Sequence, residues 1–135
     1  MSAENVQVLR DGYAAFARQD VPAVMAAFDA NIEWNTPESL PFGGTHRGHD
    51  GVGAFFAQLA EHWQELSVEP LEFIDGGGDT IVVLARSRAT GSGGRLDMDI
   101  IHLWRMRDGK AVSFTEFMDT ARALGALGQE SASTA

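Results

Sequence analysis

The chain has 135 residues, is 44% hydrophobic and carries a formal net charge of −9, which fits one acidic domain long enough to bury its own core. Only 10 Lys and Arg oppose 19 Asp and Glu, and this excludes nucleic acid and an acidic membrane surface as partners. The absence of cysteine excludes disulfides, thiolate metal sites and cysteine nucleophiles.

The N-terminus shows no basic stretch followed by an apolar one, which a signal peptide requires. No apolar run approaches the roughly 20 residues of a membrane helix. We therefore expect a soluble, cytoplasmic protein.

The first part of the chain has helical periodicity. Val6, Leu9, Tyr13 and Phe16 are spaced as one apolar stripe and predict a helix that ends near Gln19. A short second helix follows, capped by Asp20, with Val24, Met25 and Phe28 on its inner face.

Residues 31–34 predict a short strand, and residues 36–48, rich in Pro and Gly, predict a loop. A third helix capped by Asp50 comes next. Its apolar stripe is wide and consists of Val52, Phe55, Phe56, Leu59, Trp63 and Leu66.

Beyond this helix the apolar period changes to two. Residues 68–75, 80–90, 94–107 and 110–119 predict strands separated by glycine-rich turns. Asp119 is placed to cap a last helix over residues 120–127. Helices followed by antiparallel strands predict an α+β fold in one domain, residues 1–127, with a flexible tail over residues 128–135.

The last hairpin decides which residues share a face. Read as a three-residue loop with a glycine bulge, RDG pairs Met106 with Lys110 and places His102 opposite Phe114. Trp104 then pairs with Val112 and Ile100 with Glu116. One face of the hairpin carries Met98, Ile100, His102, Trp104, Val112, Phe114, Glu116 and Met118. A two-residue turn would instead move Glu116 to the other face.

In the first register, His102 and Glu116 are diagonal neighbours within hydrogen-bonding reach. A carboxylate on an apolar face requires a partner. A histidine beside it gives a pair that can titrate near neutral pH and move a proton. The same two residues can also be a satisfied polar pair with a purely structural role.

Three segments resemble the SnoaL-like branch of the nuclear transport factor 2-like superfamily, to which ketosteroid isomerase belongs. They are YAAFARQDVPAVMAAFDANIEW, LPFGGTHRGHDGVGAFF and HLWRMRDGKAVSFTEFMDTA, and the match spans about residues 6–127. The resemblance implies a cone-shaped α+β barrel, with a strongly curved, mostly antiparallel sheet wrapped around the N-terminal helices. It also implies an apolar pocket and a homodimer formed through the outer sheet face.

Carrying the isomerase residues over changes the expected chemistry. Its general-base aspartate falls on Trp34, which cannot accept a proton from carbon. Its oxyanion-hole acid falls on His102 if one residue of turn length is gapped, and its oxyanion tyrosine falls at Gly12, beside Tyr13.

We therefore expect His102 and Glu116 to be catalytic, with His102 as acid, base or oxyanion donor. The expected function is acid/base proton transfer on a hydrophobic carbonyl compound, as in an isomerase, cyclase or dehydratase, without cofactor or metal. The substrate-binding residues that we expect to line the pocket are Tyr13, Trp34, Phe55, Phe56, Trp104, Phe114 and Met118.

Three alternatives remain open. The domain can bind an apolar small molecule without chemistry, or it can be a dimerising domain whose cone is filled. Epoxide hydrolase-type chemistry needs an Asp–Arg–Asp set, which Asp97, Asp99 and Arg86 or Arg88 imitate. The predicted register places these aspartates on the face away from His102, where a cross-strand charge ladder is the simpler interpretation.

Overall fold

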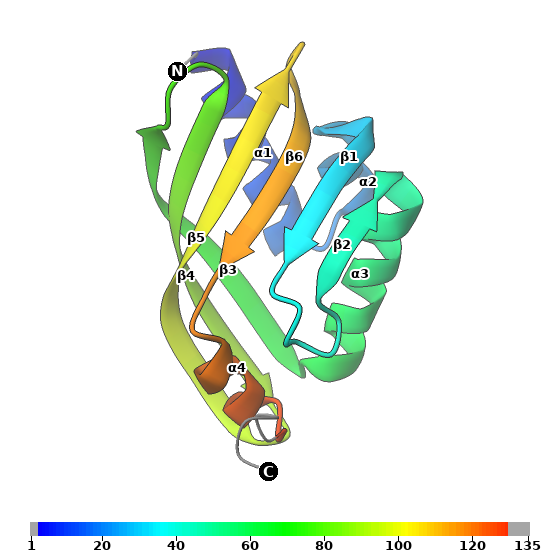
Figure 1. The fold of residues 1–135 in the computed structure, drawn as a ribbon, viewed down its shortest axis with the longest axis vertical. Helices are drawn as coiled ribbons and strands as arrows, with labels where there is room; N and C mark the ends of the chain where they lie inside the picture. The colour runs from blue at the N-terminus through cyan, green and yellow to red at the C-terminus, as the bar shows by residue number, and fades with distance from the viewer. Residues whose placement is uncertain (1–2, 130–135) are drawn as a thin grey trace.

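One curved sheet organises the molecule. The computed structural model describes residues 3–129, and its six strands lie in the order β2-β1-β6-β5-β4-β3 (Figure 1). All neighbours are antiparallel except β1 and β6. The strands are β1 (Phe28–Thr36), β2 (Gly44–Arg47), β3 (Glu65–Asp75), β4 (Thr80–Gly91), β5 (Gly94–Arg107) and β6 (Lys110–Phe117). The predicted α+β class with a curved, mostly antiparallel sheet is confirmed.

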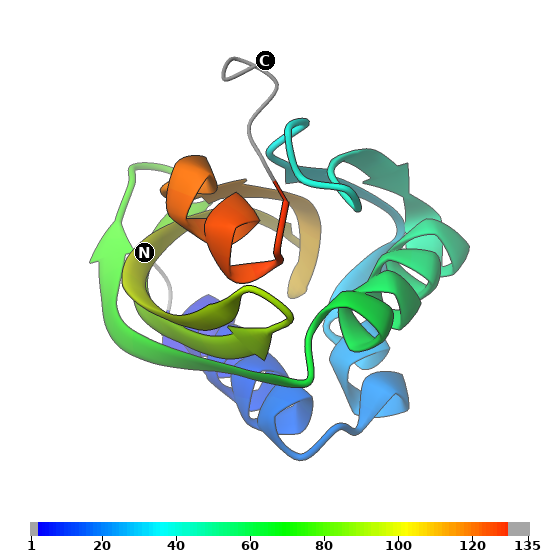
Figure 2. The same ribbon diagram turned by 90° about the horizontal axis from the view of Figure 1, so that it is seen from below.

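Three helices lie on one face of this sheet (Figure 2). They are α1 (Ala3–Ala17), α2 (Val21–Ala26) and α3 (Gly48–His62), and a fourth, α4 (Thr120–Ala126), follows the last strand. The Asp20 side chain accepts a hydrogen bond from the Ala23 amide at the start of α2, and Asp119 does the same for Arg122 at α4. Both predicted caps are therefore confirmed.

Several predicted boundaries were wrong. Phe28 begins β1 instead of extending α2, and Leu66 belongs to β3 instead of α3. Asp50 lies in the first turn of α3, whose N-cap is Arg47, and the Arg47 side chain makes no capping hydrogen bond. The segment expected to be a loop contains β2, because Gly44 to Arg47 pair with β1. The tail expected over residues 128–135 lies outside the described residues from residue 130 onward.

The register of the last hairpin also differs from the expectation. Asp108 and Gly109 have φ of 52° and 74° and form a two-residue turn, so Arg107, and not Met106, pairs with Lys110. Met106 therefore pairs with Ala111, while Arg105 pairs with Ser113. This leaves Val112 as an extra residue on β6.

That bulge restores the face of the strand that a two-residue turn alone would have reversed. Beyond it, His102 pairs directly with Glu116 and Trp104 with Phe114. The predicted pairings His102–Phe114, Trp104–Val112, Ile100–Glu116 and Met106–Lys110 were thus wrong, and Ala111, not Val112, is the buried residue near the turn. His102 and Glu116 nevertheless share the inner face, because the shorter turn and the bulge each reverse the face of the strand and together cancel.

Helix α4 closes the far end of the curved sheet, where it lies against the β4–β5 turn (Figure 2). The Gly93 amide donates to the carbonyl of Ala126, and the Ser92 hydroxyl donates to that of Leu127. A Cβ at Gly93 would overlap the carbonyl oxygen of Gly125 and lie 2.6 Å from the Gly128 nitrogen. The close approach of two backbones therefore requires glycine at this turn.

We expect Gly93→Ala to lower the free energy of unfolding by about 1–3 kcal/mol, the usual cost of overpacking. Gly125→Ala is the matched control: a Cβ there meets no atom within 4 Å, and alanine favours the helix by up to about 1 kcal/mol. Urea unfolding of both variants checks this. Equal stabilities would show that α4 does not pack against the turn as described.

Candidate active site

A cavity lies between the helices and the inner face of the sheet. The cavity has a volume of about 100 Å³, whereas a single water molecule needs roughly 10–15 Å³. The cone is therefore not filled, and this contradicts the alternative of a domain with a solid interior.

Each residue expected in the pocket lies in its wall. The predicted residues on the cavity are Tyr13, Trp34, Phe55, Phe56, His102, Trp104, Phe114, Glu116 and Met118. They come from α1, α3, β1, β5 and β6 and from the residue that follows β6. The wall is apolar except for a few side chains, as is usual for small-molecule sites.

Sequence reasoning missed other wall residues. Leu40 and Phe42 come from the Pro- and Gly-rich segment between β1 and β2, and both are buried. The signal available in the sequence was the presence of two large apolar residues in a segment otherwise rich in Pro, Gly and polar residues. Ser87 of β4 also lines the cavity, and its place in the alternation of Val83, Ala85 and Ala89 indicates the inner face.

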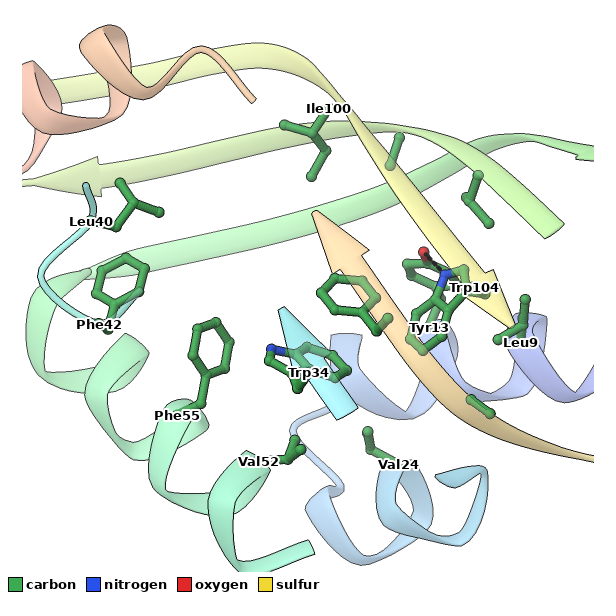
Figure 3. Close-up of a cluster of buried hydrophobic side chains, with 14 of the residues drawn as sticks. Leu9, Tyr13, Val24, Trp34, Leu40, Phe42, Val52, Phe55, Ile100 and Trp104 are labelled. Atoms are coloured by element: carbon green, nitrogen blue, oxygen red, sulfur yellow. Dashed lines mark hydrogen bonds between the residues drawn. The ribbon is translucent and has the colours of Figure 1, made fainter. Parts of the chain in front are cut away.

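A chain of hydrogen bonds joins the polar groups of the wall. The Trp104 Nε1–H donates to the Tyr13 hydroxyl oxygen over 3.0 Å, and that hydroxyl lies 2.6 Å from His102 Nδ1. His102 Nε2 lies 2.9 Å from Glu116 Oε2. Tyr13 and Trp104 lie side by side in Figure 3. Four residues from one helix and two strands are thereby linked into one relay, Trp104–Tyr13–His102–Glu116.

Two proton arrangements satisfy this relay. An indole only donates, so the Tyr13 hydroxyl can donate its own proton to a neutral His102 at Nδ1, and His102 Nε2–H then donates to the Glu116 carboxylate. If His102 is instead an imidazolium, both its nitrogens donate. The Tyr13 oxygen then accepts hydrogen bonds from both Trp104 and His102. The Tyr13 O–H group stays intact and is free to donate to a ligand in the cavity.

Both ring nitrogens of His102 are bonded within the protein, and the residue is 5% exposed. Glu116 uses one carboxylate oxygen for His102, and among the described residues its other oxygen, Oε1, has no hydrogen-bond partner. The geometry thus leaves Glu116 and Tyr13 as the members of the relay with an atom to offer a ligand.

Tyr13 is held in its neutral form. Burial raises the pKa of its phenol well above the usual value, more than the hydrogen bond from Trp104 lowers it, and the charge of Glu116 raises the pKa further. Tyr13 is consequently a hydrogen-bond donor or acceptor in the wall, and not a base.

An aromatic cluster covers the opposite side of the cavity. Trp34 stacks on Phe114 with ring centroids 3.8 Å apart, because the parallel register of β1 and β6 places them side by side. Phe55 and Phe56 of α3 pack against the same indole. Trp34 Nε1 is buried and has no hydrogen-bond partner among the described residues.

The Asp–Arg–Asp set forms, but away from the cavity. Arg86 contacts Asp97 at 2.6 Å and Asp99 at 2.9 Å, with all three side chains partly exposed on the outer face. The hydrogen bond from Arg86 lowers the pKa of Asp97. None of the three lines the cavity, so they form the cross-strand charge ladder.

The histidines of residues 46–49 make backbone contacts: His46 Nε2 with the Phe42 carbonyl and His49 Nε2 with that of Phe28. Across residues 3–129, no three His, Asp or Glu side chains gather as a metal site would require. The same part of the chain has no helix that is both long and apolar enough to span a bilayer.

Comparison with known sequences agrees with this architecture. The SnoaL-like domain family matches residues 9–114. The chain belongs to this family. No curated protein matches the chain significantly.

Solved structures share the SnoaL-like fold over nearly the whole chain. An NTF2-like protein of unknown function from Burkholderia pseudomallei K96243 is 36% identical with a TM-score of 0.88, covering 93% of this chain and 98% of its own. TerC, co-crystallised with polyporic acid, is 29% identical with a TM-score of 0.88, covering 94% and 100%. A putative SnoaL-like polyketide cyclase from Jannaschia sp. CCS1, 18% identical with a TM-score of 0.79 over 94% and 95%, shares the fold alone.

Tyr13 is the only tyrosine of the chain, so tyrosinate absorbance reports on it directly. We expect the native protein to show no ionisation near pH 10, whereas the protein unfolded in denaturant ionises there. Above pH 10 the unfolded state binds fewer protons than the native state, so stability falls as pH rises. Absorbance at 295 nm against pH, with and without denaturant, checks this, and a native midpoint near 10 would contradict the buried relay.

Proposed function

We propose that this SnoaL-like protein is an acid/base enzyme that moves a proton on a hydrophobic carbonyl compound. The observation that carries the proposal is the relay, which ends on a carboxylate in the wall of an apolar cavity. A buried acid and base beside an apolar binding space are the parts that carbon–hydrogen proton transfer needs. Isomerisation, cyclisation and elimination all contain this step.

In the proposed mechanism, Glu116 takes a proton from the carbon beside the carbonyl through Oε1. The carbon–hydrogen electron pair moves into the carbonyl, whose oxygen becomes an enolate oxygen. Tyr13 donates a hydrogen bond to that oxygen while His102 is an imidazolium. Return of the proton from Glu116 to another carbon completes an isomerisation.

His102 is a positioning residue in this scheme, because both of its nitrogens bond to other side chains. Hydrogen bonds from its two ring nitrogens orient the Tyr13 hydroxyl towards the ligand and hold the Glu116 carboxylate in place. The sequence suggested that His102 itself contacts the substrate, and the geometry supports Glu116 and Tyr13 for that contact.

We expect Glu116→Gln to reduce turnover about 10²–10⁴-fold, the usual contribution of a general base. We expect His102→Ala to reduce turnover by the same order, because the variant no longer orients Tyr13 and Glu116. Deuterium exchange into 2-tetralone, followed by proton NMR in D₂O, measures the step without knowledge of the natural substrate. His62→Ala is the control, since this histidine contacts the Gln58 carbonyl outside the cavity wall.

Thermal unfolding of each variant separates lost chemistry from lost structure. Full exchange activity in both variants would refute the proposed roles. Binding of 2-tetralone by the wild-type protein without faster exchange would instead favour a binding domain without chemistry. TerC co-crystallised with polyporic acid supports this second function as well, because it shows a similar chain together with a small molecule.

We also propose that the protein forms a homodimer through the outer face of the sheet. Ile101 and Phe117 are cross-strand partners there and are 42% and 51% exposed. Adjacent exposed apolar side chains on a sheet face favour contact with another protein surface. A second copy of the chain supplies the same patch about a two-fold axis.

We expect Ile101→Lys to convert the dimer to a monomer, because a lysine on this face loses its water in the interface. Val21→Lys is the matched control: Val21 is 41% exposed but lies on α2. Analytical ultracentrifugation measures both. A wild-type monomer, or a dimer unaffected by Ile101→Lys, would contradict this arrangement.

A further inference from the structure

The indole nitrogen of Trp34 is a hydrogen-bond donor that the proposed chemistry does not use. Trp34 is 6% exposed, and its Nε1 is the buried side-chain polar atom that has no partner among the described residues. Trp104, by contrast, donates its indole proton to Tyr13. Buried donors normally find an acceptor, so this one needs an explanation.

An isolated water explains it poorly. A buried water needs two to four polar partners, whereas the neighbours of this indole are aromatic rings. The rings within 6 Å of it belong to Phe28, Phe55, Phe56, Trp104 and Phe114. A ligand that fills the cavity brings an acceptor and apolar contacts together.

The nitrogen also lies away from the relay. In Figure 3 it is at the end of the indole that faces Phe55, opposite to Tyr13 and Trp104. The Phe114 ring packs against both the His102 imidazole and the Trp34 indole, with distances between ring centroids of 4.7 Å and 3.8 Å. Trp34 and the relay thus lie at separate places in the cavity wall, with aromatic surface between them.

We propose that Trp34 Nε1 donates a hydrogen bond to a carbonyl oxygen of the ligand, and that the ligand is a neutral, flat aromatic ketone or quinone. A neutral ligand is favoured because the cavity wall contains Glu116 but no Lys or Arg among the described residues, so a buried anion would lack a counter-charge. A flat ligand matches the ring-lined wall. The inference deepens the proposed function by naming the ligand class, and it rests on the same cavity.

The matched pair 9-fluorenone and fluorene tests this assignment, because the two have the same skeleton and only the ketone has an acceptor. Fluorenone also has no removable hydrogen beside its carbonyl, so its binding is independent of proton transfer. We expect the wild-type protein to bind fluorenone about tenfold more tightly than fluorene, as one buried hydrogen bond provides. Fluorene-9-carboxylate is expected to bind more weakly than fluorenone.

Trp34→Phe is expected to abolish the preference for fluorenone, since without the donor the carbonyl loses its bonds to water uncompensated. Trp63→Phe, which removes another buried indole from the same wall, is expected to keep it. Isothermal titration calorimetry measures these affinities.

A second measurement uses the wild-type protein alone. The chain has three tryptophans, and loss of one indole cross-peak in Trp34→Phe assigns the Trp34 signal in the ¹H–¹⁵N spectrum. Fluorenone is expected to move this indole proton downfield, whereas fluorene is not. Equal wild-type affinities, a preference that survives Trp34→Phe, or equal shifts with both compounds would overturn the assignment. Inactive proton exchange with an intact fluorenone preference would refute the proposed chemistry alone.

Discussion

A carboxylate in an apolar wall must be bonded or neutral, and the contact between Glu116 and His102 meets this requirement here. The imidazole that holds Glu116 is itself held at its other nitrogen by Tyr13, and Tyr13 is held by Trp104. Removal of any member leaves a buried polar group without its partner. The relay therefore links α1 to β5 and β6.

The cavity beside this relay exists because its walls resist collapse. Long strands with alternating burial carry their apolar residues inwards along a strong bend, and α4 closes the far end through backbone contacts to the β4–β5 turn. Rings from α3, β1, β5 and β6 pack against one another around the open space. The stiffness of these aromatic contacts allows polar groups to be placed at separate points of one apolar chamber.

Much of this architecture follows from local sequence signals. Asp20 and Asp119 cap the helices that their positions predict, and the period-two segments are the strands. The hairpin register did not follow. Asp108 and Gly109 are a common sequence for a two-residue turn, but no local signal places the bulge at Val112, and either feature alone would reverse the face of Glu116. Chain periodicity likewise could not show that Tyr13 bonds to His102, residues that are 89 positions apart.

The position of Trp34 links the fold to the chemistry. In the resemblance to the isomerase, this position on the first strand carries the general base, whereas here it carries an N–H that can only donate. In the proposed mechanism the acceptor is instead Glu116 on β6, directly opposite His102. Trp34 and Glu116 thus lie on neighbouring parallel strands, with Phe114 stacked on Trp34 two residues before the carboxylate. A ligand with two carbonyl groups that spans this ring surface can present one carbonyl to the indole and, in the proposed mechanism, the carbon–hydrogen bond beside the other to the carboxylate. On a shared scaffold, the polar groups of the inner face, and not the fold, decide which chemistry a chain can support.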